Sequence, residues 1–248
     1  MRRFLVLTIV ILLLSACAPP QRTKVPNLVW PRPPAKPRIK LIGIYKNTFD
    51  VRPPGSADVI VGSVTALELQ RPGSAVGDLE GNIYVSDLRL LQIVKFDLVH
   101  QKVITTSGKG PRKLVLPFDL AIDDQRGLLF VVDQGPDVVY VMDKDTFLIK
   151  KAIGQGEFKK AVSVAVDPER QRVYVTDTKI HKLVAFDYDG KKLWEVGKGK
   201  RASGPDGFNS PASVAVDSKG NVYVADTFNR YVKIYSPEGR FIKKIGYG

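Results

Sequence analysis

The chain has 248 residues, and its 38 lysines and arginines against 25 aspartates and glutamates give a formal net charge of +13. A single cysteine excludes a disulfide bond within the chain, and only two histidines are present. So basic a chain favours polyanionic partners, namely lipid headgroups, envelope polymers or an acidic protein.

The first residues have the order of a secretory signal. Arg2 and Arg3 precede an apolar run, Phe4–Leu14, that is too short to span a bilayer comfortably. The stretch Leu14-Ser15-Ala16-Cys17 resembles the bacterial lipobox. This resemblance implies that residues 1–16 are removed as a signal peptide and that the thiol of Cys17 receives a diacylglycerol, which anchors the chain to a membrane. An ordinary signal peptide followed by an incidental cysteine is the alternative.

Export restricts the compartment and the partners. Without Arg2 and Arg3 the formal charge is 36 − 25 = +11, so the exported part stays strongly basic. In the lipoprotein sorting rule, an aspartate directly after the lipidated cysteine favours retention in the inner membrane. Ala18 occupies that position here, so the resemblance to lipoproteins implies that the protein is located at the outer membrane. We therefore expect a cell-envelope protein, for which nucleic acid fits the charge but not the compartment.

A proline-rich segment comes next. Seven prolines lie between Pro19 and Pro37. Because proline fixes φ and cannot donate to a ladder, residues 17–38 are expected to form an extended, solvated tether. Residues 39–70 are assigned to an N-terminal strand or strands and a connector.

Four segments of the remaining chain repeat one pattern. Each has an apolar strand, an acidic or glycine-containing turn, a second strand and a final aspartate. The segments are AVGDLEGNIYVSD, LAIDDQRGLLFVVD, VAVDPERQRVYVTD and VAVDSKGNVYVAD, ending at Asp87, Asp133, Asp177 and Asp226. The final aspartates are thus 46, 44 and 49 residues apart.

Two more strands follow each aspartate. A third strand closes at Asp97, Asp143, Asp187 or Ser236, and a fourth ends in glycine at Gly108, Gly154, Gly197 or Gly246. Four short strands in a period of about 40–50 residues are the signature of a propeller blade. No segment sustains a 3.6-residue apolar period. The sequence therefore predicts an all-β fold, with four β-propeller blades over residues 71–248.

The repeats resemble the NHL-repeat family, most closely in Pro211–Gly246. Its Asn-His-Arg-like stretch aligns with Asn229-Arg230-Tyr231 and Ile180-His181-Lys182, whereas Leu90-Leu91-Gln92 and Pro136-Asp137-Val138 depart from it. The resemblance implies a propeller that binds proteins, RNA or small molecules. Because such rings usually have six blades, an incomplete or split ring is expected.

The N-terminal strand bears on this question. Arg38–Gly43 looks like the fourth strand of the last repeat, Arg240–Gly246, and would close a blade that is not in the chain. An open arc whose edge is covered by residues 40–70 is the alternative.

Catalytic chemistry is not indicated by any motif. His100 and His181 fall in turns expected on opposite faces of the blades, so they are interpreted as surface residues and no metal, cofactor or catalytic residue is predicted. Gly108–Lys113 has the composition of a phosphate loop but runs into a strand expected from Leu114, which favours a turn. The repeated aspartates, one per blade, are interpreted as structural acceptors for backbone amides.

Basic residues concentrate in the loops between blades and in those between second and third strands. These loops share one face of a propeller. The candidate partner-binding residues are Lys109, Arg112, Lys113, Lys159, Lys160, Lys179, Lys182, Lys198, Lys200, Arg201 and Arg230. We expect a non-catalytic binding module for a protein or an anionic envelope polymer. The alternative to a basic face is that these lysines and arginines are scattered over the surface and only keep the protein soluble. The functional alternatives are a metal-dependent enzyme resembling amidating lyases or lactonases, and a small-ligand sensor.

Overall fold

The computed structural model describes residues 23–36, 38–52 and 67–246. Two compact units make up the chain, residues 1–69 with 96–103 and residues 70–95 with 104–248. The expected signal peptide and Cys17 lie outside the described residues. Within the described ranges, no helix is long and apolar enough to cross a membrane.

The first unit contains a small hairpin. Strand β1 (Val29–Trp30) pairs antiparallel with β2 (Ile39–Lys40). The hairpin differs from the sequence interpretation in two ways. Part of the expected tether forms a ladder, and the expected blade-closing strand has β1 as its partner. A two-residue ladder leaves no alternation that a pattern could reveal.

The same unit contains a single helical turn, α2 (Thr48–Val51). Asn47 caps it, because its side-chain oxygen accepts from the amide of Phe49 at 2.8 Å while Asp50 accepts from the amide of Asn47 at 3.1 Å. The sequence does not predict this turn, since four residues are too few to show a helical period.

Four four-stranded antiparallel sheets, here called blades 1 to 4, form the repeat region. The strands of blade 1 are β3 (Pro72–Gly77), β4 (Ile83–Asp87), β5 (Gln92–Asp97) and β6 (Lys102–Thr106). Those of blade 2 are β7 (Pro117–Asp123), β8 (Leu128–Asp133), β9 (Val138–Asp143) and β10 (Ile149–Ile153). Those of blade 3 are β11 (Ala161–Asp167), β12 (Arg172–Asp177), β13 (Lys182–Asp187) and β14 (Lys192–Val196). Those of blade 4 are β15 (Pro211–Val216), β16 (Val222–Asp226), β17 (Tyr231–Tyr235) and β18 (Phe241–Ile245), with the 3-10 turn η1 (Thr227–Asn229) after β16.

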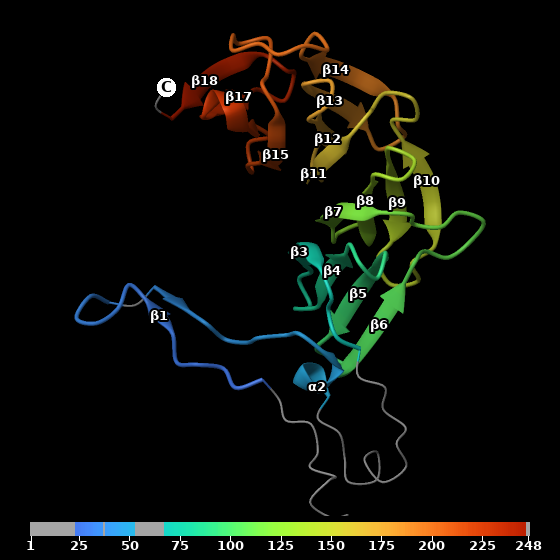
Figure 1. Cartoon of the computed structure of the whole chain (residues 1–248), viewed down its shortest axis with the longest axis vertical. Coiled ribbons are helices and arrows are strands. Elements are labelled where there is room, and N and C mark those ends of the chain that lie inside the picture. Colours follow the sequence, from blue (N-terminus) through green and yellow to red (C-terminus); the bar gives the residue numbers. More distant parts are fainter. Residues whose placement is uncertain (1–22, 37, 53–66, 247–248) are drawn as a thin grey trace, which may run out of the picture. The chain divides into compact units, whose positions relative to one another are not determined.

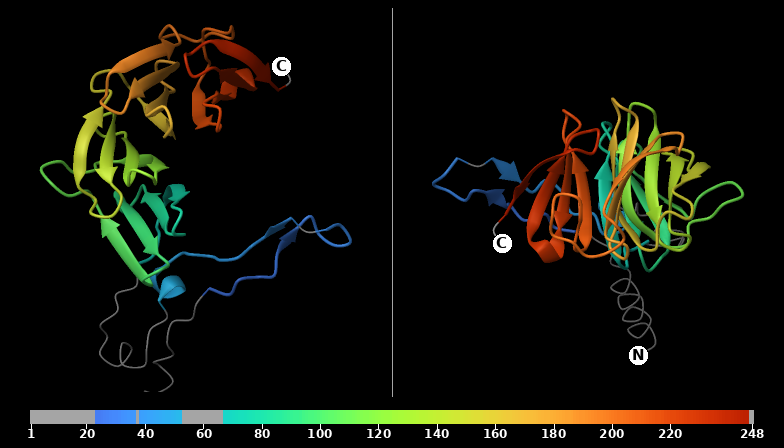
Figure 2. Two further views of the ribbon diagram at one scale, coloured as in Figure 1. Left: turned by 180° about the vertical axis from the view of Figure 1, so that it is seen from behind. Right: turned by 90° about the horizontal axis from the view of Figure 1, so that it is seen from above.

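Within the second unit, the blades follow one another in chain order around an open arc (Figure 1). Neighbouring blades contact mainly through their first strands, β3, β7, β11 and β15, which line the inner side of the arc. The fourth strands lie on the outer side, as the view from behind also shows (Figure 2).

A separate apolar core fills each space between neighbouring blades. In β8, Phe130 and Val132 pack against blade 3, whereas Leu129 and Val131 pack against blade 1. Successive side chains of a strand point to opposite faces, so a strand with a blade on each side must be apolar at every position. This requirement explains the unbroken run Leu128–Val132.

The first strand of every blade starts with the same irregularity. The register shifts after the first paired residue, and in three blades that residue is a proline, namely Pro72, Pro117 and Pro211. Proline cannot donate to the ladder and is tolerated at the start of an edge strand or at a bulge. The innermost strands meet both conditions.

Each second strand ends at a fully buried aspartate. In blades 1 to 3 this aspartate accepts backbone amides from two loops, and in blade 4 Asp226 accepts the backbone amide of Asn209 and the side-chain amide of Asn229. In blade 3, Asp177 Oδ2 accepts from the amides of Lys159 and Lys160 at 2.7 and 2.8 Å, and Oδ1 accepts from those of Lys179 and Ile180 at 2.7 and 3.0 Å. The loop before the blade is thereby joined to the turn between its second and third strands. The structural interpretation of these aspartates is confirmed.

Glycines complete the junction at the ends of the fourth strands. Gly197 has a φ of 108°, and a side chain on it would collide with the backbone carbonyl of His181 in the neighbouring turn. Gly246 has a φ of 126° and stands in the same relation to Arg230. Only glycine combines this backbone conformation with so close an approach.

Replacing the fully buried Asp177 by alanine should lower the free energy of unfolding by about 3 kcal/mol or more, because four backbone amides lose their acceptor. Asp189→Ala is the control, since the Asp189 side chain is 92% exposed and pairs only with Lys151 at the surface. Urea unfolding of both variants measures the difference. Equal stabilities would contradict the assigned role.

Candidate functional site

The candidate site is the end of the blades at which the second strands stop, here called the loop face. It consists of the loops between blades and the turns between second and third strands. The buried aspartates hold the two kinds of loop together in each blade, as Asp133 shows by accepting from the amides of Val115, Leu116 and Gly135 at 2.7 to 3.0 Å. Because these amides serve Asp133, β7 begins at Pro117 and not at the expected Leu114.

The turns of the loop face share one backbone conformation. The middle residue of each Asn-His-Arg-like triplet has a positive φ, between 53° and 59°, at Leu91, Asp137, His181 and Arg230. Four different side chains therefore occupy the same left-handed position. The backbone conformation of the repeat is therefore the same in all four turns, even where the residue types depart from the family pattern.

Three of the candidate lysines converge around one aspartate. The backbone amides of Lys159, Lys160 and Lys179 all donate to Asp177, which brings the three residues together while their side chains stay exposed. Among the described residues, no carboxylate lies within 4.0 Å of any of the three amino groups. We call these residues the lysine cluster.

The loop between blades 3 and 4 carries a second basic group, Lys198, Lys200 and Arg201. Lys198 pairs with Asp206 at 2.9 Å, with both side chains largely exposed. Asn229 donates its side-chain amide to the carbonyl of Ala202 at 2.8 Å, which brings the turn that contains Arg230 to this loop. Lys182, also a candidate, is partly neutralised by Glu195 at 2.7 Å.

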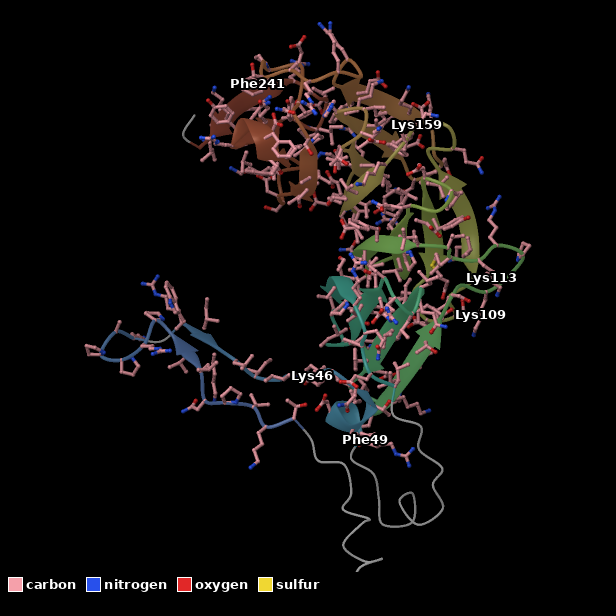
Figure 3. The ribbon with its side chains drawn as sticks, in the orientation of Figure 1. Lys46, Phe49, Lys109, Lys113, Lys159 and Phe241 are labelled. Carbon is pink, nitrogen blue, oxygen red and sulfur yellow. The ribbon has the colours of Figure 1, made fainter. Side chains whose placement is uncertain are left out.

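The remaining candidates lie on the loop between blades 1 and 2. Lys109 and Lys113 lie on the outer side of the arc (Figure 3). Lys113 donates to the carbonyl of Gly108 at 2.7 Å, and Arg112 is exposed. The eleven candidates therefore form several groups along the arc and do not converge on one point.

Hydrogen bonds connect the loop-face turns of one blade to the start of the next blade. Gln134 in a turn of blade 2 donates to the carbonyl of Ala161 at 2.6 Å, and His181 Nδ1 accepts from the amide of Ser210 at 3.1 Å. The half-buried His181 thus has a structural role that its interpretation as a surface residue missed. The loop face is continuous from blade 2 to blade 4.

A buried lysine, which the sequence did not predict, holds the second basic loop. The side chain of Lys233 has no exposure, and its amino group lies 2.8 Å from Asp226 while donating to the carbonyls of Gly204 and Gly207 at 2.9 and 2.6 Å. One sequence signal was available. This third-strand position is apolar or aromatic in the other blades, at Val94, Tyr140 and Val184.

Several basic residues at the opposite end of the blades are paired with acids. Arg126 and Arg170 each lie 3.0 Å from a buried aspartate three residues earlier, Asp123 and Asp167. The buried Lys144 bridges Asp124 at 2.8 Å and Asp78 at 3.3 Å. The lysine cluster has no such partners among the described residues, so its positive charge is not compensated by neighbouring acids.

The charges at the paired end shift the titration of their partners. Burial of Asp78 acts to raise its pKa, but hydrogen bonds from Asn82 and the contact with Lys144 outweigh burial and lower it. The amide of Thr146, together with Lys150, lowers the pKa of Asp143 to about 2 against the opposing effect of burial. These carboxylates stay ionised and are saturated by their own surroundings.

Histidines and acids do not form a metal site in the part of the chain that the structure describes. His100 Nδ1 lies 2.9 Å from Asp97 on an exposed turn. No group of three or more histidine, cysteine, aspartate or glutamate side chains in the described ranges is arranged to hold an ion.

Comparison with known proteins identifies the architecture. The family described as SMP-30/Gluconolactonase/LRE-like region matches residues 131–248, which are 118 of the 248 residues. No curated protein matches the sequence.

Solved structures resemble the chain at low identity. Hydrazine synthase from Kuenenia stuttgartiensis has a TM-score of 0.57 and 16% identity, over 73% of this chain and 50% of that chain. Virginiamycin B lyase from Staphylococcus aureus has a TM-score of 0.57 and 12% identity, over 71% and 56%. A streptogramin B lyase gives 0.57 and 12%, over 71% and 54%. The chain thus spans about half the length of these structures, and the likeness confirms the predicted β-propeller blades.

Replacing Lys233 by methionine should free the loop that carries Lys200 and Arg201, because Gly204 and Gly207 lose their donor and Asp226 is left as an unpaired buried charge. The expected result is faster tryptic cleavage after Lys200 or Arg201 and a loss of about 3 kcal/mol in stability. Lys244→Met, at an exposed position in β18, is the control. Unchanged cleavage in Lys233→Met would contradict the role assigned to Lys233.

Stability should fall in acid between about pH 4 and pH 2. The pKa of Asp143 is lower in the folded chain than its usual 3.8, so the unfolded chain binds more protons in this window and is favoured as pH drops. Asp143→Asn should cost about 1 to 2 kcal/mol at pH 7 and much less near pH 2, where about half of the folded carboxyl is protonated. Urea unfolding at both pH values measures this. A cost that is equal at the two would rule out the carboxylate as its source.

Proposed function

We propose that the blades form a non-catalytic binding module that presents its loop face to an anionic partner in the cell envelope. The observation that carries this proposal is the asymmetry of charge compensation. The lysine cluster is exposed without carboxylate partners among the described residues, while Arg126, Arg170 and Lys144 at the other end are paired. Uncompensated positive charge attracts and orients polyanions.

The partner class follows from the chemistry of the loop face. Lysines that are exposed, flexible and spread over several loops suit an extended polyanion, such as a phosphorylated or carboxylated envelope polymer, or an acidic protein surface. They do not form an enclosed pocket in which one small molecule would be buried. Lipidation of Cys17 and location at the outer membrane are parts of the same proposal and rest on the lipobox-like N-terminus.

The finer family assignment also belongs to this proposal. The strand pattern and the positive φ in the middle of each triplet support an NHL-type repeat, and the matching family description supports a propeller of gluconolactonase type for blades 2 to 4. An enzyme is the second candidate, favoured by that family description. Stoichiometric, tightly bound zinc or calcium in the purified chain would support the enzyme over the binding module.

Reversing the charge of the lysine cluster should weaken binding. The triple variant Lys159→Glu, Lys160→Glu and Lys179→Glu should bind immobilised lipopolysaccharide, used as a model polyanion, about 10-fold more weakly or worse. Its affinity should also depend less steeply on salt, because fewer ion contacts are made.

The matched control reverses three exposed residues in the turns at the opposite end, Lys191→Glu, Lys219→Glu and Arg240→Glu. This control has the same net charge as the test variant. Equal loss in both would mean that total charge, and not the loop face, determines binding, and the proposal would fail.

A further inference from the structure

The β1–β2 hairpin exposes a continuous apolar surface. Trp30 lies opposite Ile39 in the ladder, and Leu41 donates its amide to the carbonyl of Leu28 at 2.8 Å. Directly opposed residues of a hairpin share a face, so the four side chains stand on the same side. Trp30 is 66% exposed, Ile39 64% and Leu28 50%. Such a patch on a two-stranded ladder marks an interaction surface.

The charge around this patch has only one sign. Residues 18–49 contain seven basic residues and no acidic ones. Four of the seven, Arg32, Lys36, Arg38 and Lys40, lie in the hairpin and are exposed. None of the four has a carboxylate within 4.0 Å among the described residues. The first acid, Asp50, is buried and accepts the amides of Thr23, Lys46 and Asn47.

We propose that this hairpin binds the surface of an anionic lipid bilayer, with Trp30 and Ile39 at the level of the headgroups and the basic side chains on lipid phosphates. Tryptophan is enriched at membrane interfaces, and basic residues beside an apolar face are attracted to anionic lipid. The absence of carboxylates from residues 18–49 argues against a second copy as the occupant. Pairing two such hairpins would oppose like charges.

The inference goes beyond the proposed function, because it uses neither the loop face nor a lipidated Cys17.

The two tryptophans of the chain make the test direct. Trp194 lies in β14, where its ring is 5.7 Å from that of Tyr174 and its indole nitrogen donates to Pro237. Trp194→Phe leaves Trp30 as the sole tryptophan, and Trp30→Phe leaves Trp194. Each full-length variant is mixed with phosphatidylcholine–phosphatidylglycerol vesicles that carry brominated acyl chains. Emission from Trp30 should shift to the blue and be quenched, and emission from Trp194 should not change.

Charge is tested in the Trp194→Phe background. Lys36→Glu with Arg38→Glu should raise the lipid concentration for half-maximal quenching about 30-fold or more, since each basic residue near an anionic surface contributes about fivefold. Lys191→Glu with Lys219→Glu, two exposed lysines of blades 3 and 4, is the matched control and should leave quenching unchanged.

Three results would overturn the inference. They are an unquenched Trp30 in folded protein, equal quenching by vesicles of phosphatidylcholine alone, and a concentration-dependent blue shift without lipid, which would indicate a second copy. Lipopolysaccharide binding by the lysine cluster is measured separately. A failure of either proposal is therefore distinguishable from a failure of the other.

Discussion

A buried carboxylate at the end of each second strand is the interaction on which the rest of the blade depends. The chain must turn there twice, once entering the blade and once between its second and third strands, and both turns leave amides without ladder partners. An amide buried without an acceptor costs about 1–3 kcal/mol. Asp177 resolves four of them with two oxygens. The aspartate thus fixes the backbone of the loop face independently of the side chains that the loops carry.

The packing between blades was largely predictable. A strand with a blade on each side has to be apolar at consecutive positions, and every residue of Leu128–Val132 is apolar. In blade 4, by contrast, Val222 and Val224 are buried while Tyr223 and Ala225 are half-exposed. The letters of β16 hardly differ from those of β12, because the pattern of a single strand does not record what lies on its second face.

The details of the loop face were less predictable. The sequence placed the basic residues on the correct loops, since loop position follows from strand order. It could not show that Lys182 and Lys198 have acidic neighbours, or that Lys233 is buried, because these contacts join residues that lie 7 to 29 positions apart. The β1–β2 hairpin escaped prediction for a related reason: its ladder is too short for a period, and its prolines indicate an irregular segment.

At the loop face the fold uses the backbone amides, whereas it does not use the charges of the side chains. The fold requires only the amides of Lys159, Lys160 and Lys179, and in blade 2 the corresponding amides belong to Val115, Leu116 and Gly135. Apolar residues and glycine therefore satisfy the same structural need. A lysine at such a position adds charge that the blade does not use, and clustering three lysines costs mutual repulsion that the fold does not repay. We propose that a polyanionic partner offsets that repulsion, so that the charge of the cluster serves binding and not folding.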